Sequence, residues 1–329
     1  IRNISSTLSQ TVNLTLSDTQ STGKVVTSTQ DVIFTPGGVT QFVIKNPTDG
    51  TVDNSIPVTV EAQDQFGNKN ISYAGGVTLL TDGSATGGGL ITLTLGQGTR
   101  NISDSVAQTV NLTLSDTQST GLNISSTQDV VFSSGVVTQF VVKNPIDGTV
   151  DNPITVTVEA QDQFGNKNTA YNNDVTLIAS GGATGAGLVD IVNGSGIRNI
   201  SSSLSQTVNL TLVDTQSTGK SVSSSQDVVF SAGVVTQFAI INPADGTVDN
   251  SIPVTVEAQD QYGNKNLTYS NDVTLNASGG ATGGGLVDIV NGAGARNISS
   301  TLSQTVNLTL SDTQSTGKSV ISTQDVLFS

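Results

Sequence analysis

The chain has 329 residues, 12% of them charged, and a net charge of −14. It contains no Cys, His, Met or Trp, which excludes disulfides, thiolate and imidazole metal ligands, and cysteine or histidine catalysis. The acidic charge has no basic tract to offset it, so the chain would repel nucleic acid and anionic lipid. No apolar run approaches the roughly 20 residues of a membrane-spanning helix. We therefore expect no nucleic-acid partner and no membrane span in this segment.

The sequence repeats itself every 98 residues, as in "QTVNLTL" at Gln10, Gln108, Gln206 and Gln304. Residues 135–231 match 233–329 at 78 of 97 positions. A long fixed period predicts tandem units, and each unit is long enough to form its own core. In chain order we expect residues 1–36 to be the C-terminal half of an incomplete repeat. Three complete repeats should follow at 37–134, 135–232 and 233–329.

Residues 37–134 contain seven segments in which apolar residues share one parity. The inward-facing residues are Phe42 and Ile44 in the first segment, Ile56, Val58, Val60 and Ala62 in the second, and Tyr73, Val77 and Leu79 in the third. Residues 88–96 form the fourth, Ile102 and Val106 begin the fifth, Val110, Leu112 and Leu114 lie in the sixth, and Val130 and Phe132 in the seventh. This alternation is typical of a β-sandwich, and no window has a helical period. We predict an all-β chain of tandem seven-stranded Ig-like β-sandwiches in a linear array.

The polar phrase "VEAQDQFGNKN" occupies 60–70, 158–168 and, with Tyr262 in place of Phe, 256–266. It should end the second strand and form the turn that follows. Asp64 is placed to accept backbone N–H groups of the turn, and Gly67 can supply a positive φ. Phe66 has inward parity, which predicts a plug over one end of the core. Tyr262 indicates that this ring lies at the rim, where a hydroxyl can reach water.

The pattern "TVEAQDQFGN", followed by a tyrosine, "DVTL" and a closing "QDVVF" before "GVVTQF", resembles the tandem bacterial Ig-like repeats of large surface proteins. The modules of invasin- and intimin-type adhesins are similar, with an A-x-D-x-x-G-N signature at the end of an early strand. The resemblance implies a stalk, an adhesin or a surface-layer component, and an extracellular or cell-surface location. Fold alone does not settle function.

Calcium is one interpretation of the acidic turn "NPTDGTVDN". The candidate ligands are Asp49, Asp53, Asp147, Asp151, Asp245 and Asp249, because calcium prefers carboxylate and carbonyl oxygens. Pro-x-Asp-Gly is also an ordinary turn sequence, and the spacing favours this second interpretation. No other cofactor is expected.

Thirteen Asn-x-Ser/Thr sequons occur in the chain, and such sites can be glycosylated if the source has the machinery. Eleven of them are taken as candidates: Asn3, Asn13, Asn70, Asn101, Asn111, Asn123, Asn199, Asn209, Asn266, Asn297 and Asn307. Several are the same position in successive repeats. A Thr- and Asn-rich surface produces such sequons as by-products.

Three further chemistries are disfavoured. A lysine–asparagine isopeptide bond would need a retained lysine, and Lys45 and Lys143 are replaced by Ile241 in the third copy. The nine Phe and four Tyr fall at repeated positions of core or rim parity, so none is expected to remain for a saccharide platform. Acidic pairs that recur in every repeat do not indicate an active site, so we expect no enzyme.

These observations predict an extracellular structural repeat region that forms a cell-surface stalk, fibre or filament. Its partners would be neighbouring repeats of the same longer chain, with self-assembly into filaments as a further option. The short joint "FSSGVVTQF" leaves almost no free linker, which predicts a semi-rigid rod. The alternative is an adhesin module that recognises cells or glycans through loops at the ends of the repeats.

Overall fold

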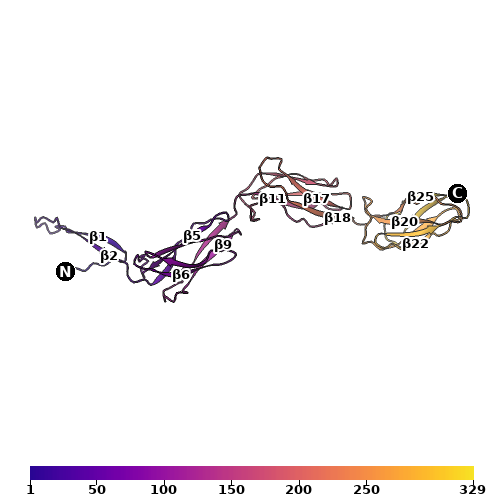
Figure 1. Cartoon of the computed structure of the whole chain (residues 1–329). Coiled ribbons are helices and arrows are strands. Elements are labelled where there is room, and N and C mark those ends of the chain that lie inside the picture. The colour runs from indigo at the N-terminus through magenta and orange to yellow at the C-terminus, as the bar shows by residue number, and fades with distance from the viewer. The chain divides into compact units, whose positions relative to one another are not determined.

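The computed structural model describes all 329 residues and contains 25 strands and no helix (Figure 1). The predicted all-β class is confirmed. Tandem β-sandwiches are present as predicted, because each complete repeat has two sheets of its own. The structure has no helix long and apolar enough to cross a membrane.

The chain forms two compact units, residues 1–137 with 161–168, and residues 138–160 with 169–329. These units do not coincide with the predicted boundaries at 37, 135 and 233, which stay a prediction. Every strand pairing nevertheless lies within one predicted repeat. The short stretch 161–168, which begins at the last residue of the strand Ile154–Gln161, belongs to the first unit.

The first unit contains a hairpin and the first complete repeat. The hairpin strands are β1 (Gln10–Thr15) and β2 (Thr29–Phe34). The repeat contains β3 (Gln41–Ile44), β4 (Gly50–Thr51), β5 (Ile56–Gln63), β6 (Gly75–Thr81), β7 (Gly89–Leu93), β8 (Gln97–Ile102), β9 (Gln108–Ser115) and β10 (Gln128–Ser133). One sheet has the order β3-β5-β8 and the other β4-β10-β9-β6-β7.

The second unit contains most of the second repeat and all of the third. The second repeat has β11 (Gln139–Val142), β12 (Gly148–Thr149), β13 (Ile154–Gln161), β14 (Val175–Ala179), β15 (Gly187–Val189), β16 (Ser195–Ile200), β17 (Gln206–Val213) and β18 (Ser225–Ser231). The third has β19 (Gln237–Ile241), β20 (Ile252–Gln259), β21 (Val273–Ala277), β22 (Gly285–Val287), β23 (Ala293–Ile298), β24 (Gln304–Ser311) and β25 (Thr323–Phe328). The third repeat thus has the predicted seven strands, and the first two add a two-residue strand that pairs in parallel with β10 or β18.

The core of each repeat lies between its two sheets. Val58 and Val60 on β5 have no exposed surface, and neither do Leu79 on β6 and Leu112 on β9. These residues have the parity that the sequence predicted. Phe42 contacts Tyr73 edge to face, with ring centroids 5.7 Å apart, a geometry that aromatic quadrupoles favour. Burial of this apolar face, rather than the polar outer face, drives the sheets together.

Two expectations about this repeat are wrong. The fifth strand does not begin at Ile102 but ends there, as β8. Phe66 does not plug the core, because its side chain is 55% exposed. β5 ends at Gln63 and Gly67 has a φ of +83°, so the chain has already turned when it reaches Phe66 and strand parity no longer applies. The placement of Tyr262 near water is confirmed, since it is 49% exposed.

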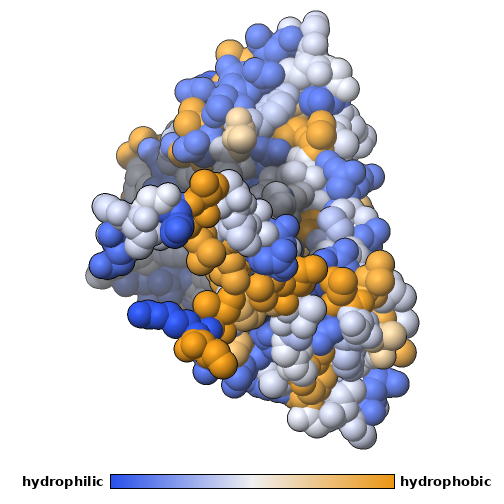
Figure 2. Space-filling model, turned by 90° about the vertical axis from the view of Figure 1, so that its left-hand side faces the viewer, coloured by the Kyte–Doolittle hydropathy of each residue, from blue (hydrophilic) through white to orange (hydrophobic).

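The N-terminal hairpin has the register of β9 with β10. Val12 lies opposite Val32 as Val110 lies opposite Val130. Val12 and Val32 are only half-buried, whereas Val110 and Val130 are fully buried. Exposed apolar side chains in this segment include Leu16, Val25 and Ile33, and Figure 2 shows an apolar band among polar residues on the face that it presents.

Candidate functional site at the repeat junctions

The turn after β5 is built around the buried carboxylate of Asp64, which is 2% exposed. Its Oδ1 atom accepts the backbone N–H groups of Phe66 at 2.9 Å and Asn68 at 3.0 Å. Its Oδ2 atom accepts the N–H of Gly37 at 2.9 Å. The prediction that Asp64 would accept turn N–H groups is therefore confirmed. Because Gly37 lies in the segment that enters the repeat, one carboxylate fixes both the turn and the entry point of the chain.

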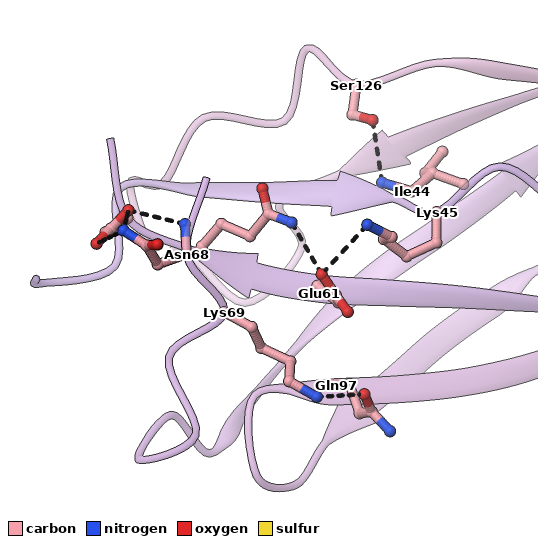
Figure 3. A network of polar contacts seen from close by, with 9 residues as sticks. Ile44, Lys45, Glu61, Asn68, Lys69, Gln97 and Ser126 are labelled. Atoms are coloured by element: carbon pink, nitrogen blue, oxygen red, sulfur yellow. Dashed lines mark hydrogen bonds and ion pairs between the residues drawn. The ribbon is translucent and has the colours of Figure 1, made fainter. Parts of the chain in front are cut away.

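The Asn68 side chain extends this network beyond the repeat. Its Nδ2 group donates to Asp64 and, at 2.8 Å, to the carbonyl of Thr7 in the preceding segment. Its Oδ1 atom accepts the N–H of Ser9 at 3.0 Å. Figure 3 shows Asn68 beyond the end of the strand that carries Glu61. One amide thus forms a two-way hydrogen-bond pair with the backbone on either side of residue 8.

The same pair recurs in the other copies. Within the first unit, the Asn166 amide donates to Ser105 O and accepts from Ala107 N, both at 2.9 Å. Within the second unit, Asn264 donates to Ser203 O and accepts from Ser205 N, also at 2.9 Å. The sequence reasoning did not identify these asparagines as contact residues. Their retention in all three copies of the polar phrase was the available signal.

Hydrogen bonding keeps the carboxylates of this network charged. The Asn68 amide, assisted by the N–H groups of Gly37, Asn68 and Phe66 and opposed by burial, lowers the pKa of Asp64 to about 2. Burial raises the pKa of Asp162 and Asp260, but the hydrogen bonds from Asn166 and Asn264 and from backbone N–H groups outweigh it, so both are lowered. A buried carboxylate that accepts several N–H bonds behaves in this way.

At the joints that lead into the second and third repeats, a second carboxylate is contributed by the preceding repeat. Asp53 Oδ2 accepts the N–H of Val136 at 2.8 Å, and its Oδ1 atom accepts the Gln163 amide at 3.2 Å. Asp151 accepts Val234 N–H at 2.7 Å and the Gln261 amide at 3.4 Å. A Cβ at the neighbouring Gly233 would overlap the Asp151 carboxylate, so a larger residue there would require the Asp151 side chain to move.

The six aspartates that were candidates for calcium binding therefore make different kinds of hydrogen bond. Asp49, Asp147 and Asp245 each accept one N–H of the last strand of their own repeat, at 2.8 Å. Asp249 has a positive φ of 65° and donates its own N–H to Ser300 O. The structure has no group of three or more acidic residues that could hold a metal ion. Calcium binding stays a prediction, and the geometry favours the turn interpretation.

The sequon asparagines fall into distinct environments. Asn13, Asn111, Asn209 and Asn307 each donate to the aspartate opposite them at 2.7–2.8 Å. Asn70 and Asn266 donate at 2.8 Å to the carbonyls of Gly37 and Gly233 at the joints. Asn123 Oδ1 accepts the Ser125 N–H, and Asn199 Oδ1 accepts the Thr155 hydroxyl. Asn3, Asn101 and Asn297 are exposed. Glycosylation stays a prediction, and at Asn70 and Asn266 it would compete with a joint contact.

The lysines considered for an isopeptide bond make surface ion pairs instead. Lys45 lies 3.6 Å from Glu61 (Figure 3), and Lys143 lies 3.4 Å from Glu159. Both lysine side chains are about half exposed, so these pairs contribute little to stability. The aromatic side chains were predicted to occupy core or rim positions, with none left for a saccharide platform, and three of them are half exposed. Phe66, Phe164 and Tyr262 are 55%, 48% and 49% exposed, and each lies beside the joint asparagine of its own repeat.

No protein-family model matches the chain, and no curated protein matches it. Solved structures similar to it include the Escherichia coli adhesin FdeC, at 14% identity over 89% of this chain and 99% of that one, with a TM-score of 0.44. Invasin, a bacterial integrin-binding protein, shares 14% identity over 88% of this chain and 60% of its own, with a TM-score of 0.36. InvD of Yersinia pseudotuberculosis shares 17% identity over 88% and 97%, also with a TM-score of 0.36. Bacterial adhesins are thus among the structures that the chain is similar to, as the sequence resemblance predicted.

Proposed function

We propose that the chain is a structural repeat region of an extracellular protein, and that it forms part of a cell-surface stalk or fibre. The observation that carries the proposal is the joint itself. The same asparagine makes the same two backbone hydrogen bonds to the preceding segment at Asn68, Asn166 and Asn264. A contact reproduced at each joint is expected of a chain whose task is to hold its repeats in a set relation.

The composition supports the same role. Nothing in the chain brings histidine or cysteine chemistry to a pocket, and its perturbed aspartates are engaged by backbone N–H groups and amides rather than by an open cleft. Structural networks of charged groups also perturb pKa values. On this proposal, Asp64, Asp162 and Asp260 stabilise the joints. The proposal includes that the chain has no catalytic activity.

Electron microscopy of the purified 329-residue chain tests the stalk role. We expect extended particles of one length, because the linkers are short and bonded at both ends. Particles that are compact, or that curl into many shapes, would contradict a stalk. Particles joined end to end or side by side would extend the proposal to filament assembly.

The second candidate function is an adhesin module that recognises its target through loops at the ends of the repeats. The half-exposed rings of Phe66, Phe164 and Tyr262 favour it, since aromatic side chains are enriched at recognition surfaces. The two roles are compatible, because a stalk can carry binding sites along its length.

A further inference from the structure

The Tyr262 ring is held at the surface by a rigid backbone. Its N–H group donates to Asp260 Oδ1 at 2.8 Å, and the next residue, Gly263, has a φ of +87°. The ring is not part of the core of the third repeat, which is built around Phe238 and Phe328. An aromatic ring that is half exposed adds little to folding. A fixed backbone, however, lowers the entropy that is lost when such a ring binds a ligand.

The ring lines a pocket of about 410 Å³ whose other walls come from the second repeat. This volume lies within the roughly 300–1,000 Å³ of ordinary ligand pockets. The wall residues include Asp151, Asn152, Thr184 and Ser202, with Gly182 leaving space between them. One apolar surface is therefore surrounded by hydroxyl, amide and carboxylate groups from another repeat.

The corresponding residues around Phe164 differ in ways that matter for a ligand. Gly182 replaces Ser84 of the first repeat, and Ser202 replaces Asp104. In the first repeat these two side chains bond each other at 2.7 Å. The second repeat thus loses a carboxylate and a hydroxymethyl group from this wall, while Tyr262 adds a phenol that Phe164 lacks. Compared with the surroundings of Phe164, the part of the pocket formed by the second repeat is more open and less acidic, and the Tyr262 ring adds a hydroxyl group.

We propose that the pocket floored by Tyr262 binds a neutral saccharide. The apolar face of a pyranose ring would lie on the tyrosine, and its hydroxyl groups would meet Asp151, Asn152 and Thr184. This chemistry needs an amphipathic ring beside polar groups that both donate and accept. The net charge of −14 and the Asp151 carboxylate disfavour acidic sugars. The site goes beyond the proposed structural role, and its failure would leave the stalk intact.

The test is a titration of the isotope-labelled 329-residue chain with lactose, cellobiose and maltose, followed by amide NMR signals. We expect saturable shifts at Gly182, Ser202 and Tyr262 with at least one of these sugars. Tyr262→Ala should weaken binding at least tenfold. Phe164→Ala, the matched change in the neighbouring copy, should leave the affinity unchanged.

Two further variants carry residues that already occur in other copies, so they should fold. Tyr262→Phe keeps the ring and should weaken binding less than Tyr262→Ala does. Ser202→Asp restores the acidic wall and should weaken binding at least threefold. The proposal is overturned if none of the three sugars gives saturable shifts, if Tyr262→Ala binds as the native chain does, or if 3′-sialyllactose binds more tightly than lactose.

Discussion

Single residues decide how this chain is joined, and the joint asparagines are the clearest case. Asn264 has both polar atoms of its amide engaged with the backbone of the preceding repeat, at Ser203 and Ser205. It also donates to Asp260 at 2.9 Å, which orients the amide. An asparagine is well suited to this position, because only a side chain with a donor and an acceptor in one plane can form such a pair.

Asn264→Ala should therefore loosen the joint without unfolding either repeat. Removing one partner of a hydrogen bond costs about 1 kcal/mol, so the Ser205 amide should exchange with solvent roughly five- to tenfold faster in hydrogen-exchange measurements. Asn209→Ala is the matched control, because the Asn209 side chain donates to Asp227 within its own repeat. Unchanged exchange at Ser205 would mean that the amide pair does not hold the joint.

The aspartate network predicts a dependence on acid. The pKa of Asp64 in the folded chain is about 2, below its ordinary 3.8, and a group with a lowered pKa stabilises the fold only while it is ionised. Its contribution is therefore complete above about pH 4 and is lost as the pH falls towards 2. Carboxyl NMR titration should place Asp64 well below the exposed aspartates. A midpoint at or above 3.8 would contradict the network.

Chelation separates the two interpretations of the acidic turns. Asp53 and Asp151 already accept joint N–H groups, so a calcium chelator should change the melting temperature by less than about 1 °C. A change of 1 kcal/mol moves the melting temperature by several degrees in domains of this size. A clear fall that added calcium reverses would restore the calcium interpretation.

At the scale of strands and turns, alternation predicted most of the sandwich and failed where a strand lacks apolar residues. β8 carries Gly98 and Arg100 on its inward parity and reaches an apolar residue only at Ile102. A Cβ at Gly98 would crowd Ile91, and Arg100 donates to the Leu90 carbonyl. The inward-facing positions of β8 are thus occupied by a glycine and a hydrogen-bonded arginine instead of apolar residues. The strand has no alternating hydrophobic pattern, so its position could not be predicted.

The joints were only partly predictable for a related reason. The role of Asp64 followed from turn chemistry, which is local. The partners of Asn68 in the preceding segment, Ser9 and Thr7, lie 59 and 61 residues away in the sequence, and no local pattern connects them. Phe66 was misplaced because strand parity was continued into a turn. Local rules thus predict elements, whereas contacts between repeats depend on tertiary geometry.

Gly233→Ala tests how tightly the entry segment is packed. The added Cβ would overlap the Asp151 carboxylate, and overpacking of this kind costs about 1–3 kcal/mol. Urea denaturation should show this loss. Gly38→Ala is the control, because nothing lies within 4 Å of a Cβ added there, and its effect should stay within about 0.5 kcal/mol. Equal stability of the two variants would mean that Asp151 can move aside freely.

At the scale of the whole molecule, each complete repeat has its own pair of sheets, and no strand pairing passes from one repeat to another. The repeats therefore depend on one another through a few side chains rather than through a shared sheet. Relative motion is the default expectation for domains of one chain unless their interface is large and hydrophobic. The proposed stalk role requires that the aspartate and asparagine contacts restrict the motion of one repeat relative to the next.

A distance measurement across one joint tests this requirement most directly. The chain has no cysteine, so Ile178→Cys and Asn276→Cys place two unique spin labels at equivalent exposed positions of the second and third repeats. Pulsed electron spin resonance should give one narrow distance distribution, which broadens when Asn264→Ala is added. A distribution that is already broad without that change, or one that stays narrow with it, would contradict the account.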